Sequence, residues 1–138
     1  MSGKAHTHLA IIRIVIALLA LALLAAGCSA SKTVEIGQDD NGTRIELKAG
    51  QELVVTLESN PTTGYSWDVD ELSEAVLKST GEPEFKSSSN RVGAGGTQTM
   101  RFEAIEAGEG TLTLIYHRPW EKDVDPIHTF SVQISVVE

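Results

Sequence analysis

The stretch TFSVQISV, residues 129–136, alternates polar and apolar side chains without a break. Successive side chains of a β-strand point to opposite faces of a sheet, so this pattern predicts a strand with one buried and one solvated face. Val34 with Ile36 predicts a short first strand, and residues 83–86 are another candidate. The same alternation recurs earlier in the chain, in residues 44–47, 52–58, 65–69, 99–104 and 111–117.

Turn residues separate these stretches, and Asn41-Gly42 is the strongest of the turn signals. Seven or eight short strands within about 110 residues indicate an all-β fold, an immunoglobulin-like antiparallel β-sandwich. Residues 71–78 are the only weakly helical stretch, and they are too few to build a helical domain. The sequence shows no strand–helix–strand unit, which argues against a nucleotide-binding α/β fold.

The composition narrows the range of functions. The chain has 138 residues with 19 acidic and 11 basic side chains, a formal net charge of −8. A nucleic-acid-binding surface needs a basic patch, so this charge argues against nucleic acid as a partner. The single cysteine excludes an internal disulfide bond and a cysteine-rich metal site.

The N-terminal residues 1–27 have the pattern of a lipoprotein signal peptide. Arg13 precedes an apolar run that is shorter than the roughly 20 residues of a membrane-spanning helix. The run ends in Leu24-Ala25-Ala26-Gly27-Cys28, which resembles a bacterial lipobox, with Ala25 in the place where Leu is usual. We therefore expect cleavage before Cys28 and attachment of lipid to it.

This interpretation divides the chain into a signal peptide (residues 1–27), a lipidated Cys28 with a short tether (28–32) and a folded domain (33–138). The domain would be exported and anchored by lipid to a cell membrane or envelope, facing away from the cytoplasm. A plain signal peptide, or an uncleaved N-terminal anchor with an incidental cysteine, is the alternative.

Three segments between predicted strands carry more chemistry than a turn requires. The first loop, Asn60-Pro61-Thr62-Thr63-Gly64-Tyr65-Ser66-Trp67, combines a proline that fixes φ with a glycine that permits positive φ. We expect a pre-shaped projecting loop that loses little entropy on binding. An ordinary connection between strands is the alternative.

The second loop, residues 91–96, contains Gly93-Ala94-Gly95-Gly96 and has little side-chain bulk. Such a segment lets another backbone approach closely, although a flexible hairpin loop has the same composition. The third loop, residues 117–126, contains Arg118-Pro119-Trp120. A projecting Trp beside an Arg is typical of binding hot spots, whereas a Trp folded back would cap the core.

The order of the predicted strands brings the three loops together. Two strand-like segments separate the first loop from the second, and two more separate the second from the third. Antiparallel strands alternate in direction, so every second connection returns to the same end of a sandwich. All three loops are therefore predicted at one end, where immunoglobulin-like domains present their recognition loops.

These three motifs, in this order and spacing, resemble the chagasin family of cysteine-protease inhibitors over about residues 33–137. The resemblance implies a reversible, tight-binding inhibitor of papain-like cysteine proteases, with no cofactor and no enzymatic activity. Thr62 and Thr63 would enter the centre of the active-site cleft, and Gly93–Gly96 would lie along the substrate groove. Arg118-Pro119-Trp120 would brace the other side, where the family often has Phe in place of Trp120.

The resemblance assigns protease contacts to Asn60, Pro61, Thr62, Thr63, Gly64, Tyr65, Trp67, Gly93, Ala94, Gly95, Gly96, Arg118, Pro119 and Trp120. Its implied partners are papain-like proteases and, through lipid, a membrane, and we expect a monomer. The rival hypotheses are an enzyme or a two-histidine metal site and a membrane-anchored surface module for binding or adhesion without inhibitory activity. The first rival would use His117 and His128 with Asp123 and Asp125, but it has no supporting motif or spacing.

Overall fold

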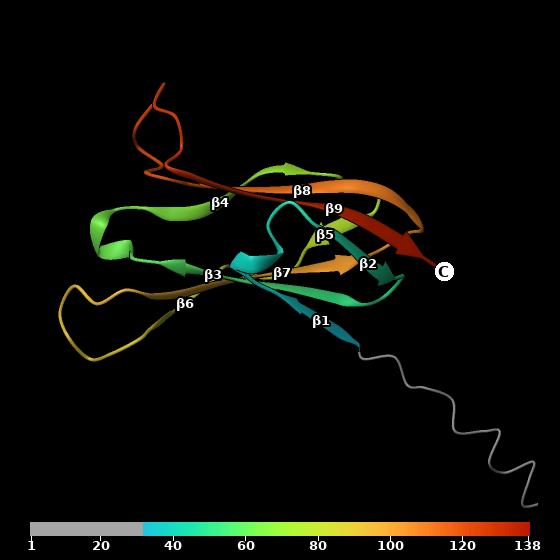
Figure 1. The fold of residues 1–138 in the computed structure, drawn as a ribbon, viewed down its shortest axis with the longest axis horizontal. Helices are drawn as coiled ribbons and strands as arrows, with labels where there is room; N and C mark the ends of the chain where they lie inside the picture. Colours follow the sequence, from blue (N-terminus) through green and yellow to red (C-terminus); the bar gives the residue numbers. More distant parts are fainter. Residues whose placement is uncertain (1–31) are drawn as a thin grey trace, which may run out of the picture. The chain divides into compact units, whose positions relative to one another are not determined.

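A computed structural model describes residues 32–138 of the chain, shown in Figure 1. The predicted signal peptide, Cys28 and all of the tether except Lys32 lie outside the described residues. In residues 32–138 the chain forms two sheets and two short 3-10 helices, η1 (Gln38–Asp40) and η2 (Pro61–Thr63). Within that same range, no helix is long and apolar enough to cross a membrane.

The first sheet contains β1 (Thr33–Ile36), β3 (Glu52–Ser59), β5 (Leu77–Ser79), β6 (Glu84–Ser87) and β7 (Gly96–Ala104). Its strand order is β1-β3-β7-β5, and β6 also pairs with β7. The second sheet contains β2 (Arg44–Lys48), β4 (Ser66–Leu72), β8 (Gly108–His117) and β9 (His128–Val137). Its order is β2-β9-β8-β4, so β4 and β2 are its edges.

The predicted all-β sandwich is confirmed. The apolar residues of the alternating stretches meet between the two sheets, and the largest fully buried side chains are Trp67, Phe102, Phe130, Leu47, Leu53, Leu57, Leu77, Leu112 and Leu114. Both sheets and this core lie within residues 33–137.

Two details of the predicted sandwich are wrong. The described chain has nine strands rather than seven or eight, and the sheets are mixed, because β1 pairs with β3 and β2 pairs with β9 in parallel. The chain crosses to the other sheet between β1 and β2 and returns at β3 after two reversals. A strand that returns to a sheet after an even number of reversals runs parallel to the one that left it. Alternation reports which face is buried, and it carries no information on the direction of the neighbouring strand.

The weakly helical stretch, residues 71–78, forms no helix. It contains the end of β4, a turn closed by hydrogen bonds from Val76 and Leu77 to the Ser73 carbonyl, and the start of β5. Leu77 is fully buried and pairs with Ala104 of β7. Burial of this leucine against the sheet therefore overrides the weak helical preference of its neighbours.

The strands β5 and β6 are two pieces of one pass along β7. Leu77 pairs with Ala104 and Glu84 pairs with Thr99, so both pieces run antiparallel to β7 in the same direction, interrupted at residues 80–83. Three strands thus separate the first loop from the second, yet they make only two passes. The prediction that the loops share one end is confirmed, and Figure 1 shows them at its left-hand side.

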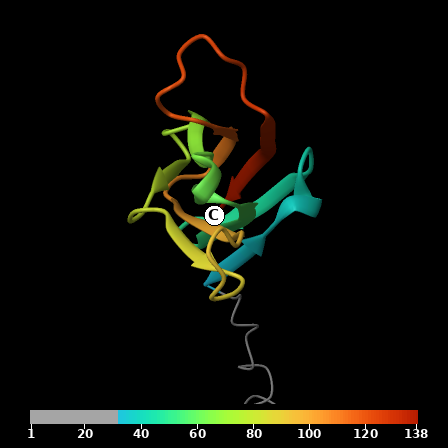
Figure 2. The ribbon, with the colours of Figure 1, turned by 90° about the vertical axis from the view of Figure 1, so that its left-hand side faces the viewer.

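The chain enters the sandwich at the opposite end. Thr33 of β1 pairs with Glu52 at the start of β3, and the Glu52 N–H donates to the Lys32 carbonyl over 2.8 Å. The strand β3 then runs toward the first loop, which follows its last residue, Ser59. Figure 2 views the molecule from the end that carries the loops.

Candidate functional site

The first loop is held in shape by its own hydrogen bonds. Asn60 caps η2: its Oδ1 accepts from the Thr62 N–H at 3.3 Å and from the Thr62 hydroxyl at 2.6 Å. The Asn60 carbonyl accepts from the Thr63 N–H at 3.1 Å and from the Thr63 hydroxyl at 2.6 Å. Pro61 supplies a fixed φ at the start of η2, and the Gly64 N–H donates to its carbonyl at 3.0 Å. Pro61, Thr62 and Thr63 are exposed, so a compact turn projects into solvent.

Gly64 is required at its position for two reasons. Its φ is +86°, in the left-handed region that side chains other than glycine rarely adopt. A Cβ built on Gly64 would also overlap the Trp120 indole, whose ring edge lies against the Gly64 backbone. The third loop therefore covers the exit of the first loop.

Trp120 is 66% exposed, and Pro119 beside it is also exposed. Trp120 projects from the third loop, as expected of a binding anchor, and it does not fold back as a cap on the core. Its ring edge contacts the Gly64 backbone, and most of the indole is exposed to solvent in the free protein.

Arg118 holds the first loop as well. Its Nε donates to the Thr63 carbonyl at 3.1 Å, and its guanidinium lies 4.5 Å from the centre of the Tyr65 ring. Its Nη1 also pairs with the Glu121 carboxylate at 3.2 Å. Arg118 is half-buried, and part of its hydrogen-bonding capacity is used within the molecule. The resemblance assigns it to the protease contact, and the structure shows that it also supports the first loop.

The second loop is joined to the first by Asn60. The Asn60 Nδ2 donates to the Gly93 carbonyl at 3.3 Å. Gly93 has a φ of +79° in a turn that is closed by a 3.1 Å hydrogen bond from the Ala94 N–H to the Arg91 carbonyl. One asparagine therefore shapes η2 with its Oδ1 and ties the second loop with its Nδ2.

Gly95 and Gly96 have structural roles at the start of β7. The Gly95 carbonyl accepts from the N–H and the hydroxyl of Ser88, at 2.9 Å and 2.7 Å. A Cβ on Gly96 would collide with the backbone of Lys86, so the predicted close approach of a backbone is that of β6. Val92 is fully exposed in this loop.

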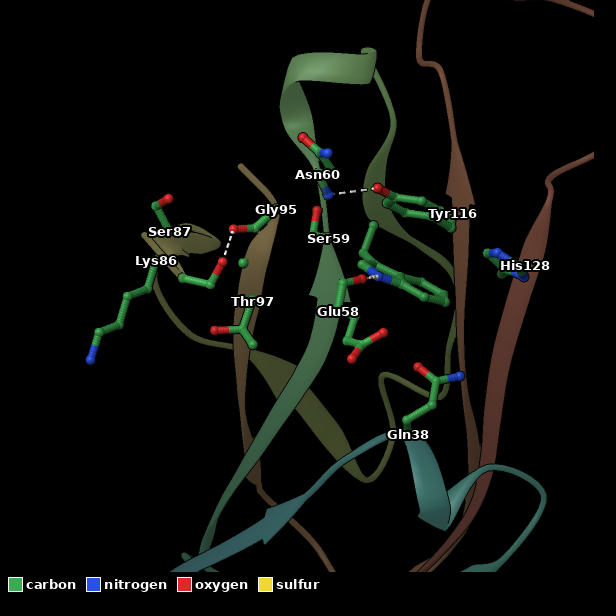
Figure 3. Close-up of a pocket in the computed structure, with 13 residues that line it drawn as sticks. Gln38, Glu58, Ser59, Asn60, Lys86, Ser87, Gly95, Thr97, Tyr116 and His128 are labelled. Carbon is green, nitrogen blue, oxygen red and sulfur yellow. Dashed lines mark hydrogen bonds between the residues drawn. The ribbon is translucent and has the colours of Figure 1, made fainter. Parts of the chain in front are cut away.

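A cluster of aromatic rings supports the base of the first loop. The buried Tyr116 of β8 accepts a 2.8 Å hydrogen bond on its hydroxyl from the Asn60 N–H, drawn in Figure 3. The Tyr116 ring lies 5.1 Å from Trp67, 5.5 Å from Tyr65 and 6.0 Å from His128, measured between ring centroids. Tyr116 lies in no loop motif, and alternation alone identified it only as a core residue.

The assignment of Trp67 to the contact surface is wrong. Trp67 is 2% exposed, and its indole N–H donates to the Glu58 carbonyl at 2.9 Å. It is an inward-facing residue of β4, because it lies two positions after the half-buried Tyr65 in an alternating strand. Trp67 therefore supports the first loop from inside the core and cannot touch a partner.

An open cleft of about 1000 Å³ lies beneath the first loop. Figure 3 shows its lining, which includes Gln38, Glu58, Lys86, Tyr116 and His128. In residues 32–138, no three His, Cys, Asp or Glu side chains gather in a way that could hold a metal ion. His117 pairs with Asp68 at 2.8 Å, and His128 stacks on Tyr116, so the structure pairs neither histidine with Asp123 or Asp125.

Comparison with known families decides the identity of the domain. The sequence model of the chagasin family of peptidase inhibitors (I42) matches residues 46–134, a span that contains all three loops. The chain belongs to the chagasin family. The family that the motifs predict is thereby confirmed, and the domain is a member of a family of inhibitors rather than of enzymes.

The relatives agree with this assignment over most of the chain. Amoebiasin-1 of Entamoeba histolytica is 30% identical over 103 residues, which cover 75% of this chain and 99% of the relative. Chagasin of Trypanosoma cruzi is 29% identical over 98 residues, covering 68% of this chain and 89% of the relative. The crystal structure of a cysteine protease inhibitor from Entamoeba histolytica has the same fold, with a TM-score of 0.67, 20% identity and coverage of 76% and 96%.

Proposed function

We propose that this domain is a reversible, tight-binding inhibitor of papain-like cysteine proteases, whose active-site cleft it closes with the three loops. Two solved structures of similar fold are named as, or as based on, inhibitors of cysteine proteases, which supports this choice of protease class. The observation that carries the proposal is that the three loops are tied to one another in the free chain. Asn60 joins the first loop to the second, and Arg118 and Trp120 join the third to the first.

These ties lower the entropy cost of binding. A flexible side chain that is immobilised at an interface costs about 0.5–1.5 kcal/mol, and a loop that must order on contact costs more. In this domain the hydroxyls of Thr62 and Thr63 are already engaged within η2, and Arg118 is already stacked on Tyr65. Most of the ordering therefore occurs during folding, and contact with a protease adds little to it.

The shape of the first loop also explains how the domain would resist cleavage. Peptides that bind in strand-like grooves do so as extended chains. Residues 61–63 instead form a 3-10 turn, held by the hydrogen bonds to Asn60 and Pro61. An extended scissile bond is thus not offered to the catalytic cysteine, and we propose that Thr62 and Thr63 cover it without reacting.

Titration of residues 29–138 against papain tests the proposal. We expect stoichiometric, reversible loss of activity, and we expect serine and aspartic proteases to be unaffected. The control is papain whose catalytic cysteine has been blocked with a small methylthio group. We expect the domain still to bind this enzyme, because occlusion needs no free thiol. Failure to inhibit papain or any other papain-like enzyme would favour a surface module for binding or adhesion.

We further propose that Cys28 carries lipid and anchors the exported domain to a membrane. In the native host, Cys28→Ser should abolish labelling with radioactive fatty acid and leave the precursor unprocessed. Cys28→Ala serves as a second variant that removes the same thiol. Labelling that persists in both variants would contradict lipid attachment at this residue.

A further inference from the structure

Gln98 of β7 makes a two-point contact between the sheets. It is 8% exposed and lies outside all three loop motifs. Its Oε1 accepts from the Trp67 N–H at 3.0 Å, and its Nε2 donates to the Trp67 carbonyl at 2.7 Å. Gln98 belongs to the first sheet and Trp67 to the second, so these hydrogen bonds cross the core.

The contact replaces a missing strand. The N–H and the carbonyl of one residue in a strand point to the same side, where a neighbouring antiparallel strand takes up both. Trp67 lies in β4, which among the described strands is an edge strand that pairs with β8 alone. The side-chain amide of Gln98 offers one acceptor and one donor, and both backbone groups of Trp67 use them.

Gln98 also stands where the stems of two loops converge. Ser59, the last residue before Asn60, lies with its hydroxyl 3.4 Å from the Gln98 Oε1, while Trp67 follows the exit of the first loop. Gly96, which ends the second loop, precedes Gln98 by two positions on β7. The Gln98 side chain therefore contacts the residues that enter and leave the first loop, and Gln98 itself lies on the strand that follows the second loop.

We propose that Gln98 is a positioning residue for inhibition: it fixes the stem of the first loop against the second loop, and so sets the shape that enters the protease. This inference rests on the proposed inhibitory function. Gln98 touches no partner itself, because it is buried beneath the loops. Its effect on a protease would pass through Trp67 and Ser59.

The first test replaces the amide with an apolar side chain of similar length, Gln98→Met. The variant leaves the N–H and carbonyl of Trp67 unpaired in the core, which destabilises the loop stem. We expect the inhibition constant for papain to rise by about tenfold or more. Amide hydrogen exchange at Asn60 and Gly64 should quicken, because their hydrogen bonds depend on that stem.

A matched control separates positioning from general loss of stability. Val136→Ala removes buried apolar volume at the end of β9 that is remote from the loops. We expect this variant to lower the melting temperature comparably while the inhibition constant and loop exchange stay within about threefold of the parent. Equal loss of inhibition in both variants would overturn the proposal, as would parental inhibition and loop exchange in folded Gln98→Met.

The conservative variant Gln98→Glu gives a readout that a purely structural role would not move. A carboxylate accepts from the Trp67 N–H but cannot donate to its carbonyl, and only the protonated acid does both. We therefore expect the ratio of the inhibition constants, variant over parent, to fall as the pH falls from 7.5 to 4.5. Glu58, Lys86, Tyr116 and His128 of the adjoining cleft are the same in both proteins, so the ratio compares proteins that differ only at residue 98.

A flat ratio across this range would count against the two-point contact. If the parent inhibits neither papain nor any other papain-like enzyme, the proposed function fails, and loop exchange still decides the role of Gln98. Faster exchange in Gln98→Met but not in Val136→Ala would support positioning. Equal exchange in the two variants would contradict it.

Discussion

At the end of the sandwich opposite the loops, backbone hydrogen bonds join the turn between β2 and β3 to the neighbouring strands. The Gly50 N–H donates to the Ala104 carbonyl at 2.7 Å, and the Ala49 N–H donates to the Val137 carbonyl at 2.9 Å. At the loop end, backbone hydrogen bonds also close the turns, and side chains add the contacts that join one loop to another or to the core: the amide of Asn60, the guanidinium of Arg118 and the hydroxyl of Tyr116. The contacts of Ala49 and Gly50 therefore use backbone groups alone, whereas the contacts between the loops depend on particular side chains.

This difference explains why the loop end could be recognised in the sequence. Backbone groups are common to almost all residues, so a turn closed by them leaves only a glycine or asparagine as its trace. A loop held by side chains needs an asparagine, an arginine and a tryptophan at fixed places. The chain carries them at positions 60, 118 and 120.

The largest expected effect breaks the comparison at a pair of equivalent glycines. Gly64 and Gly50 have φ values of +86° and +85°, but a Cβ meets Trp120 at Gly64 and nothing within 4 Å at Gly50. Valine at either position should cost about 1–3 kcal/mol of stability through backbone strain. Only Gly64→Val also displaces Trp120, so papain binding should weaken by more than about 4 kcal/mol, or a thousandfold.

Chemical denaturation and inhibition assays on both glycine variants check this prediction. Gly50→Val serves as the control for strain without a neighbour. Tight inhibition by folded Gly64→Val would remove the first loop from the mechanism. Loss of inhibition in Gly50→Val would show that stability, and not the loop end, governs binding.

The next effect concerns the exposed anchor. Trp120→Ala should weaken papain binding by about 2–4 kcal/mol, the range of an aromatic hot spot, mostly through faster dissociation. Its melting temperature should change little, because the indole is 66% exposed in the free domain. Surface binding kinetics and calorimetry on one preparation give both quantities.

The matched control for Trp120 is Ile105→Ala, which trims an exposed apolar side chain between β7 and β8 at the far end. Neither binding nor melting should change much in this variant. A large drop in the melting temperature of Trp120→Ala, with intact binding by the folded fraction, would reject the anchor role and return Trp120 to the fold.

The smallest effect sharpens the comparison at a single hydrogen bond. Tyr116→Phe removes the acceptor of the Asn60 N–H and should cost about 0.5–1.5 kcal/mol of stability. Inhibition of papain should weaken by a similar amount, since the base of the first loop loses its support. Thr113→Val removes a hydroxyl contact to Ser131 on the outer face of the second sheet, and it should cost stability without loss of inhibition.

The strands and the loop end could be predicted because both depend on local residue types. Leu112, Leu114 and Phe130 alternate with polar residues, and all three are fully buried. The parallel pairs could not be predicted, since pairing direction depends on where the chain changes sheet. The division of one pass into β5 and β6 at residues 80–83 could not be predicted either, because it depends on the register of both strands against β7.

The site was predicted in part. The tips of the loops follow from proline, glycine and exposed aromatic residues, but their supports do not. Trp67 resembles a contact residue because it ends a motif, yet in the alternating pattern it shares the inward face with Tyr65, two positions earlier. Gln98 carries no signal at all, since a polar residue on an inward position is recognisable only when its partner across the core is known.

The chain enters the sandwich at the end opposite the three loops. Thr33 pairs with Glu52 at the far end, and β3 then runs its 8 residues to the first loop. At about 3.3 Å per residue, this strand is a spacer of roughly 26 Å. If Cys28 carries the proposed lipid, the anchor attaches to the domain at the end opposite the loops, and the length of β3 separates that point of attachment from the surface that would meet a protease.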